Sequence, residues 1–383
     1  MTTSQNQQKS KEDSHIGPID RMVALKRIND ASSPDSVQQF ESVEKPFALG
    51  NANRIAYGGF CVGVAIASAY QSLQKSQLSS LNIYSVQASY LGPTTLDAPV
   101  RLEVTTLRET RTFSTRLIIV KQDQGHKDKN TGIPILRSTL AFLIDFVATK
   151  GDRTIKGMVY ADQPAYKVTD HSALPTAQER QLQEVKAGRL DKGVMDAVNE
   201  MTEVVRDLYQ QKMTPEGLLW DNLGGVLTEN TTKQDERKTT EKVSYDWFKY
   251  LQENSSSNQS SPDILYPPSE RASAACFYGL VLDGYLSFLP LVFSHRYLFD
   301  ADACSSLDLS LRFHVDDLRP GLWNLREMRT IAGQDERTYS QSRLWQKTSD
   351  RSNTKDGEEE FKLIATMTQS SVMRDFEKDK SNL

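Results

Sequence analysis

The sequence has few of the residues that build disulfide frameworks, metal sites and histidine-based catalytic sites. Its 383 residues include only five histidines and three cysteines, Cys61, Cys276 and Cys304. The cysteines lack CxxC spacing and stand among apolar or small residues, which is typical of a reducing compartment and argues against a disulfide framework or a zinc knuckle. No GxSxG or HExxH motif accompanies the histidines. We therefore expect neither a Ser-His-Asp hydrolase nor a metalloenzyme, and no cofactor.

Strong charge of one sign and long apolar runs are missing as well. Forty-six Lys and Arg residues face fifty Asp and Glu residues, and the resulting net charge of -4 gives no reason to expect a nucleic-acid partner. The first seventeen residues, Met1 to Gly17, are rich in Ser, Gln and Lys, so we expect no secretory signal. The longest apolar stretch, Leu280 to Phe293, is interrupted by Asp283, Gly284 and Pro290. We expect no membrane span and a soluble, intracellular protein.

The sequence does contain an internal repeat. Val86 to Pro93 read VQASYLGP, and after about eighteen residues Arg111 to Ser114 read RTFS. Phe313 to Pro320 read FHVDDLRP, and after about seventeen residues Arg337 to Ser340 read RTYS. Such self-similarity indicates two duplicated units. The alternative is a chance match between two unrelated α+β domains.

Each repeat unit combines a helix rich in small residues with four runs typical of strands. The helices are expected at Gly58 to Gln74 and Glu270 to Leu289. A helix followed by an antiparallel meander buries one sheet face against the helix, and two such units can pair edge to edge, which predicts an α+β double hot dog. The expected strands are Ile83 to Tyr90, Val100 to Leu107, Thr112 to Val120, Ile133 to Phe146, Ser306 to His314, Leu322 to Ile331, Thr338 to Gln346 and Phe361 to Met373.

The two units are separated by a long insert. The sequence predicts a disordered tail at 1–20, an N-terminal domain at 21–150, a partly helical and disordered insert at 151–240, a C-terminal domain at 241–376 and a tail at 377–383. The C-terminal domain is expected to open with a strand at Glu241 to Leu251, and the polar segments 228–240 and 254–261 are expected to be mobile. In the insert, one amphipathic helix is expected from the spacing of Val194, Val198, Met201, Val205 and Leu208.

Short motifs of the first unit resemble the TesB-type, or type-II, acyl-CoA thioesterases, which are duplicated hot dog enzymes. Tyr57 to Gly59 resembles the Phe-Gly-Gly that precedes the hot dog helix of this family. Tyr90 to Pro93 resembles its Phe-Leu-Arg-Pro, with Gly92 in place of the arginine. Leu107 to Phe113 resembles its LRDGRSF element without the turn glycine.

The second unit carries three further family-like motifs in the family's order. Asp283 lies in the apolar segment LVLDGYL, Ser306 opens SLDLSLRFH, and Gln369 opens QSSVMR. The resemblance covers 47–146 and 241–376, whereas the insert is longer and more polar than in the family.

The resemblance implies that the protein hydrolyses fatty acyl-CoA and that Asp283, Ser306 and Gln369 activate the attacking water. Thioester hydrolysis needs a base, an oriented water and donors for the oxyanion, and Gly58 and Gly59 would offer N–H groups at a helix start. Ser305 is the register alternative to Ser306. Without the resemblance, Asp283 could be a helix N-cap or face solvent, Gln369 could face solvent on its strand, and the two glycines could serve close packing.

Two other functions fit a hot dog scaffold. An enoyl-CoA hydratase of this fold would carry a D-x-N-P-x-H element, which the sequence lacks, and a non-catalytic acyl-CoA-binding protein would need only the pocket. The resemblance implies acyl-CoA as the partner and allows homo-oligomers formed through the hot dog sheets. The last residues, Ser381-Asn382-Leu383, resemble a peroxisomal S-K-L signal with Asn382 in place of the basic residue. We therefore expect a peroxisomal protein, or otherwise a cytoplasmic one.

Overall fold

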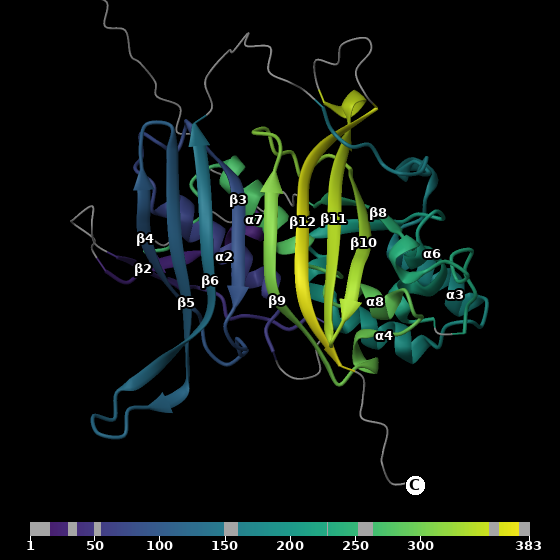
Figure 1. Cartoon of the computed structure of the whole chain (residues 1–383), viewed down its shortest axis with the longest axis horizontal. Helices are drawn as coiled ribbons and strands as arrows, with labels where there is room; N and C mark the ends of the chain where they lie inside the picture. The colour runs from purple at the N-terminus through teal and green to yellow at the C-terminus, as the bar shows by residue number, and fades with distance from the viewer. Residues whose placement is uncertain are drawn as a thin grey trace, which may run out of the picture.

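One twelve-stranded antiparallel sheet crosses the whole molecule (Figure 1). The computed structural model describes residues 16–29, 37–49, 55–148, 160–227, 229–251, 263–351 and 360–374. The strands follow one another across the sheet in the order β1-β2-β4-β5-β6-β3-β9-β12-β11-β10-β8-β7. Their bounds are β1 Leu25–Arg27, β2 Gln38–Ser42, β3 Leu81–Tyr90, β4 Arg101–Glu109, β5 Phe113–Lys127, β6 Pro134–Ala148, β7 Tyr209–Met213, β8 Ser244–Tyr250, β9 Ala303–Phe313, β10 Asn324–Gln334, β11 Arg337–Lys347 and β12 Phe361–Arg374.

The two halves of the sheet join at β3 and β9, which confirms the predicted edge-to-edge pairing. The two strands are antiparallel over five residue pairs, from Ser85 opposite Arg312 to Ser89 opposite Asp308. The strand order is the same on both sides of the join, since β3-β6-β5-β4 on one side corresponds to β9-β12-β11-β10 on the other. The repeat in the sequence is therefore a repeat of the fold, an α+β double hot dog.

The strands of each half do not form the simple meander expected from the sequence. β3 pairs with β6 rather than with β4, and β9 pairs with β12 rather than with β10. The burial of β3 explains its place: Val86 is fully buried and Ala88 is 6% exposed. A strand with this composition is most stable in the middle of a sheet, with hydrogen-bonded neighbours on both edges.

Two antiparallel helices, α2 and α7, cover one face of the sheet, and they lie behind it in Figure 1. Their close contact depends on small residues, since a Cβ atom on Gly59 would lie 2.4 Å from the Leu280 carbonyl oxygen. The predicted second helix is too long, because α7 ends at Leu282 and Tyr285 adopts a left-handed φ of 76°. The helices are α1 Pro18–Met22, α2 Gly58–Gln71, α3 Ala177–Lys186, α4 Lys192–Met201, α5 Glu203–Arg206, α6 Leu218–Asn222, α7 Glu270–Leu282 and α8 Leu289–Val292.

The insert packs at the end of the sheet near β8 and β10 (Figure 1). The amphipathic helix expected there is broken at Thr202 into α4 and α5. Val205 is 6% exposed, whereas Val194, on the same expected stripe, is 45% exposed. The insert also supplies β7, which pairs with β8. The sheet of the C-terminal domain therefore begins before 241.

Two segments expected to be disordered have ordered parts. The predicted tail 1–20 ends in α1, where Ile19 is 1% exposed and the Ser273 hydroxyl donates to Asp20 at 2.5 Å. Within 228–240, the Gln234 side chain forms two hydrogen bonds of 2.9 Å with the backbone of Val243. Residues 1–15, 254–261 and 375–383 lie outside the described residues. Among the described helices, none has the length and apolar character needed to cross a membrane.

Candidate active site

Asp283 is a buried carboxylate at the place where the two halves of the molecule meet. It follows the last residue of α7 as the C-cap and is 5% exposed. Its Oδ1 accepts hydrogen bonds from Gln369 Nε2 at 2.7 Å and from the Tyr90 hydroxyl at 3.3 Å. A backbone hydrogen bond from Gly59 reaches the same carboxylate. Burial raises the pKa of Asp283 to about 6, although these three hydrogen bonds act to lower it.

Gln369 connects Asp283 to Ser306. The amide nitrogen of Gln369, which donates to Asp283, also donates to Ser306 Oγ at 2.8 Å. Gln369 lies on β12 and Ser306 on the neighbouring β9, where the strand register shifts between Ser370 and Ser371. This irregularity brings Ser306 opposite Ser371, next to the amide of Gln369.

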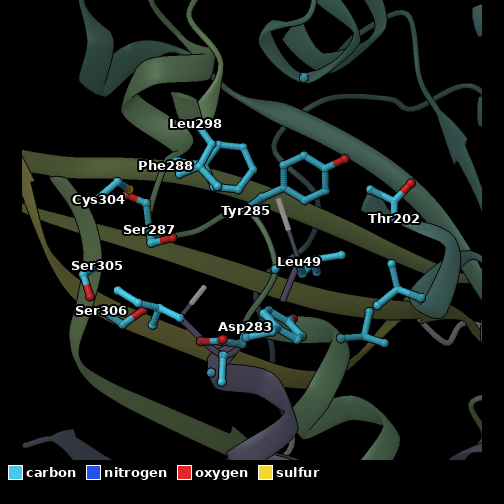
Figure 2. Close-up of a pocket in the computed structure, with 18 of the residues that line it drawn as sticks. Leu49, Thr202, Asp283, Tyr285, Ser287, Phe288, Leu298, Cys304, Ser305 and Ser306 are labelled. Carbon is cyan, nitrogen blue, oxygen red and sulfur yellow. The ribbon is translucent and has the colours of Figure 1, made fainter. Parts of the chain in front are cut away.

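The structure thus brings together the three polar residues that the sequence singled out. It also distinguishes Ser306 from Ser305, the register alternative. Ser306 contacts Gln369, whereas the neighbouring Ser305 is an exposed residue of the cavity wall. Gln369 is 1% exposed, so it does not face solvent, and Asp283 is a buried C-cap rather than an N-cap. Figure 2 shows Asp283, Ser305 and Ser306 around the same cavity.

The two glycines at the start of α2 have different surroundings. Gly59 directs its N–H to Asp283, whereas Gly58 borders the cavity. A Cβ atom on Gly58 would lie 2.4 Å from the Tyr90 hydroxyl and 2.8 Å from Asp283 Oδ2. The start of α2 lies beside Asp283 and the cavity, so the positive end of the helix dipole is directed toward both. No side-chain N-cap occupies the N–H groups of this helix start.

Two tyrosines of the site were not foreseen from the sequence. Tyr90 donates to Asp283, and the Tyr57 hydroxyl donates to the Leu280 carbonyl at 2.5 Å. Burial and the nearby Asp283 charge raise the pKa of both tyrosines well above the ordinary value. Both residues lie in motifs that carry the family resemblance, but Tyr90 and Asp283 are 193 residues apart in sequence. Their contact follows only from the way the two halves pair.

A cavity of about 500 Å³ opens beside Asp283 and Ser306. Three parts of the chain supply most of its lining: the start of α2 with the end of β3, the insert, and the segment from Val281 to Leu307. Figure 2 shows Thr202 of the insert facing the cavity, with Tyr285 and Phe288 along its wall. Apolar side chains form much of the lining, including Leu49, Val198, Val205, Phe288 and Leu298. The described residues contain no cluster of three or more His, Cys, Asp or Glu side chains that could hold a metal ion.

The chain matches two domain families. Residues 48–143 match the acyl-CoA thioesterase N-terminal domain, and residues 221–351 match the acyl-CoA thioesterase C-terminal domain. Together the two matches cover more than half of the chain. No curated protein sequence matches it.

Several solved structures resemble the whole fold. A tesB protein of Mycobacterium avium subsp. paratuberculosis and the acyl-CoA thioesterase II TesB2 of Mycobacterium marinum are each 13% identical with a TM-score of 0.54. The comparisons cover 94% of this chain and 99% and 98% of those chains, respectively. A hot dog protein of unknown function from Alicyclobacillus acidocaldarius is 13% identical with a TM-score of 0.53, over 93% of this chain and 97% of its own.

The double hot dog fold and the two family matches define a thioester hydrolase. The chain belongs to the TesB-like acyl-CoA thioesterase family. Most of the insert, residues 151–220, lies between the two family matches, whereas residues 221–240 fall within the C-terminal match.

Proposed function

We propose that the protein hydrolyses fatty acyl-CoA to a free fatty acid and CoA, with Asp283 as the base that activates water. The observation that supports this proposal is the bridging amide of Gln369, which holds Asp283 at 2.7 Å and Ser306 at 2.8 Å at the edge of the cavity. A water molecule between the carboxylate and the hydroxyl would have an acceptor for one proton and a second partner that fixes its orientation.

The proposed reaction proceeds by general base catalysis. The oxygen of water attacks the thioester carbonyl carbon while one water proton passes to the Asp283 carboxylate. The carbonyl oxygen becomes an oxyanion, which the N–H of Gly58 and the positive end of the α2 dipole stabilise. When the tetrahedral intermediate collapses, the C–S bond breaks and the CoA sulfur leaves with the proton returned by Asp283.

The ionisation of Asp283 suits this role. A carboxyl group with a pKa of about 6 is largely ionised at neutral pH, yet it is a stronger base than an exposed aspartate. The rate should therefore rise as pH increases through about 6 and then level off. The apolar lining of the cavity favours a fatty acyl chain over a short polar one.

The test is release of CoA thiol from acyl-CoA by the purified protein and by Asp283→Asn. An asparagine fills the same volume but cannot take up the proton of water, so we expect turnover to fall by at least about 100-fold while the protein remains folded. Ser305→Ala is the matched control, because Ser305 lines the same cavity without contacting Gln369. A variant Asp283→Asn with activity within a few-fold of the parent would place the base elsewhere.

The same experiment separates the alternative functions. Tight binding of acyl-CoA without thiol release would identify a non-catalytic binding protein. Hydration of an enoyl-CoA without thiol release would identify a hydratase.

A further inference from the structure

A fully buried ion pair lies next to the turn that carries Asp283. Arg326 on β10 stands directly opposite Asp246 on β8 in the sheet, and both side chains are 0% exposed. Arg326 Nε donates to Asp246 Oδ1 at 2.9 Å and Nη2 donates to Oδ2 at 2.8 Å, so the pair is bidentate. Gln211 of β7 donates to the same carboxylate at 2.6 Å. The two side chains are thus held in one relative orientation by two hydrogen bonds.

The remaining nitrogen of Arg326 points at the end of α7. Its Nη1 donates to the carbonyl oxygens of Val281 at 3.3 Å and Gly284 at 3.4 Å, and these two residues flank Asp283. The Val281 carbonyl also accepts from the Gly284 N–H at 3.2 Å, and a cation at the end of a helix interacts favourably with the helix dipole. Arg326 therefore holds the backbone on both sides of Asp283.

The backbone just beyond Asp283 is strained, and Arg326 contacts it as well. Tyr285 has a φ of 76°, a conformation that is costly for a bulky side chain and is found mainly where the surrounding structure enforces it. The guanidinium carbon of Arg326 lies 5.4 Å from the centre of the Tyr285 ring, within the range of a cation–π interaction. The segment from Val281 to Tyr285 is thus held by the arginine at three points.

From these contacts we propose that Arg326, fixed by Asp246, is a positioning residue for catalysis that holds Asp283 in line with Gln369 and Ser306. The inference rests on the proposed function, in which Asp283 is the base. A buried ion pair alone is poor evidence for a contribution to stability, because apolar residues of similar volume often replace such pairs without loss. What apolar residues cannot replace is the donor directed at Val281 and Gly284.

The pH dependence of the rate can report on this positioning. The described ionisable groups that face Asp283 are Tyr57, Tyr90 and Cys61, and the pKa of each is raised far above the range in which Asp283 titrates. Arg326 stays protonated throughout, because Asp246 raises its pKa. Hydrogen bonds from Gln369, Tyr90 and Gly59 lower the pKa of Asp283. If Asp283 were displaced, these hydrogen bonds would weaken, and the pKa of Asp283 would rise further.

The decisive variant is the double substitution Asp246→Leu with Arg326→Met. It removes both charges together, so no unpaired charge remains buried, and the fold should persist with little change in melting temperature. We expect kcat to fall by roughly 10- to 100-fold, as small displacements of catalytic groups do, with KM for acyl-CoA changed less than about threefold. The midpoint of the acid limb in the pH–rate profile should lie at a higher pH than in the parent protein.

Arg116→Met provides a matched control. Arg116 is also a buried arginine, 2% exposed, paired with Glu109 at 2.7 Å, but its Nε donates to Ser72 just beyond the far end of α2 from Gly58. Its loss should lower the melting temperature without moving the acid limb. A purely structural role for Arg326 would give the same result as this control.

Asp246→Asn is the second variant, in case the double substitution does not fold. It keeps the shape of the pair but replaces the ionic hydrogen bonds to Arg326 with weaker neutral ones. We therefore expect a smaller loss of kcat and the same upward shift of the acid-limb midpoint. Nuclear magnetic resonance of 13C-labelled aspartate measures the pH at which Asp283 is half ionised, and Asp283→Asn assigns its signal. This measurement does not require the protein to be catalytically active. An unchanged midpoint in a folded variant would overturn the inference, whether or not the parent releases CoA. A parent that releases no CoA would overturn the proposed function alone.

Discussion

The carboxylate oxygen Oδ1 of Asp283 and the amide nitrogen of Gln369 lie 2.7 Å apart although 86 residues separate them in the chain. The amide cannot accept a proton from the carboxyl group, so it orients Asp283 without competing for the proton. Its nitrogen also contacts Ser306. A substitution at any one of the three positions should therefore alter the hydrogen bonding of the other two.

Removal of the Asp283 charge should stabilise the protein. The pKa is raised to about 6 in the folded state against about 3.9 in an unfolded chain. The folded state therefore binds more protons between these values, and stability falls as pH rises through this window. We expect Asp283→Asn to raise the free energy of unfolding at pH 7.5 by on the order of 1–3 kcal/mol, and much less at pH 4. Chemical denaturation at both pH values measures this, and a variant less stable than the parent at pH 7.5 would contradict it.

Ser306→Ala and Gln369→Ala should each lower turnover less than Asp283→Asn does. A lost orienting hydrogen bond costs roughly 1–3 kcal/mol, or about 5- to 150-fold in rate. The double variant should be far less impaired than the product of the two single losses, because both residues act on one water. Steady-state thiol release gives the three rates, with Ser305→Ala as the control. Losses that simply multiply would remove the main support for a shared water.

A bulky side chain at Val205 should shorten the preferred acyl chain. Val205 lines the cavity from the insert and is 6% exposed, so Val205→Trp should fill space available to the distal methylenes. We expect kcat/KM to fall at least about tenfold for long acyl chains and to change little for short ones. Val194→Trp is the control, since Val194 lies on the same expected stripe but is 45% exposed and lies outside the cavity lining. An unchanged chain-length profile would show that the insert does not limit the substrate.

The last three residues of the sequence resemble a peroxisomal targeting signal. We propose that Ser381-Asn382-Leu383 directs the protein to peroxisomes. The last dozen or so residues, fused to a fluorescent reporter in the native host, should give a punctate signal that coincides with a peroxisomal marker. The same fusion without these three residues is the control. A diffuse cytosolic signal from the complete peptide would argue for a cytoplasmic enzyme.

The sequence predicted the elements well where hydrophobic patterning is local. The expected strand Phe361 to Met373 differs from β12 only by the last residue, and the expected strand Thr338 to Gln346 lies within β11. The order of the strands was less accessible. Nothing in the alternation of β3 states that its neighbour is β6 rather than β4, since strand order depends on long-range pairing.

Some residues of the candidate site could be predicted from the sequence, and others could not. Asp283, Ser306 and Gln369 were found because each lies in a short motif that resembles the family. Arg326 and Asp246 carry no such motif, and a charged residue within a strand usually indicates a solvent-facing position. In the sheet they stand directly opposite each other, and both are fully buried. Likewise, the helical spacing in the insert does not predict the break at Thr202 between α4 and α5.

The two central helices begin differently, and this limits how many substrates one chain can process. The start of α7 is closed by its own residue, since Ser269 Oγ accepts from the Ala272 N–H, whereas the start of α2 has no such cap and meets Asp283. The duplication has therefore produced one open helix start and one closed one. A non-hydrolysable thioester analogue should titrate the protein at one equivalent per chain, and turnover should follow a simple hyperbola, without signalling between the halves.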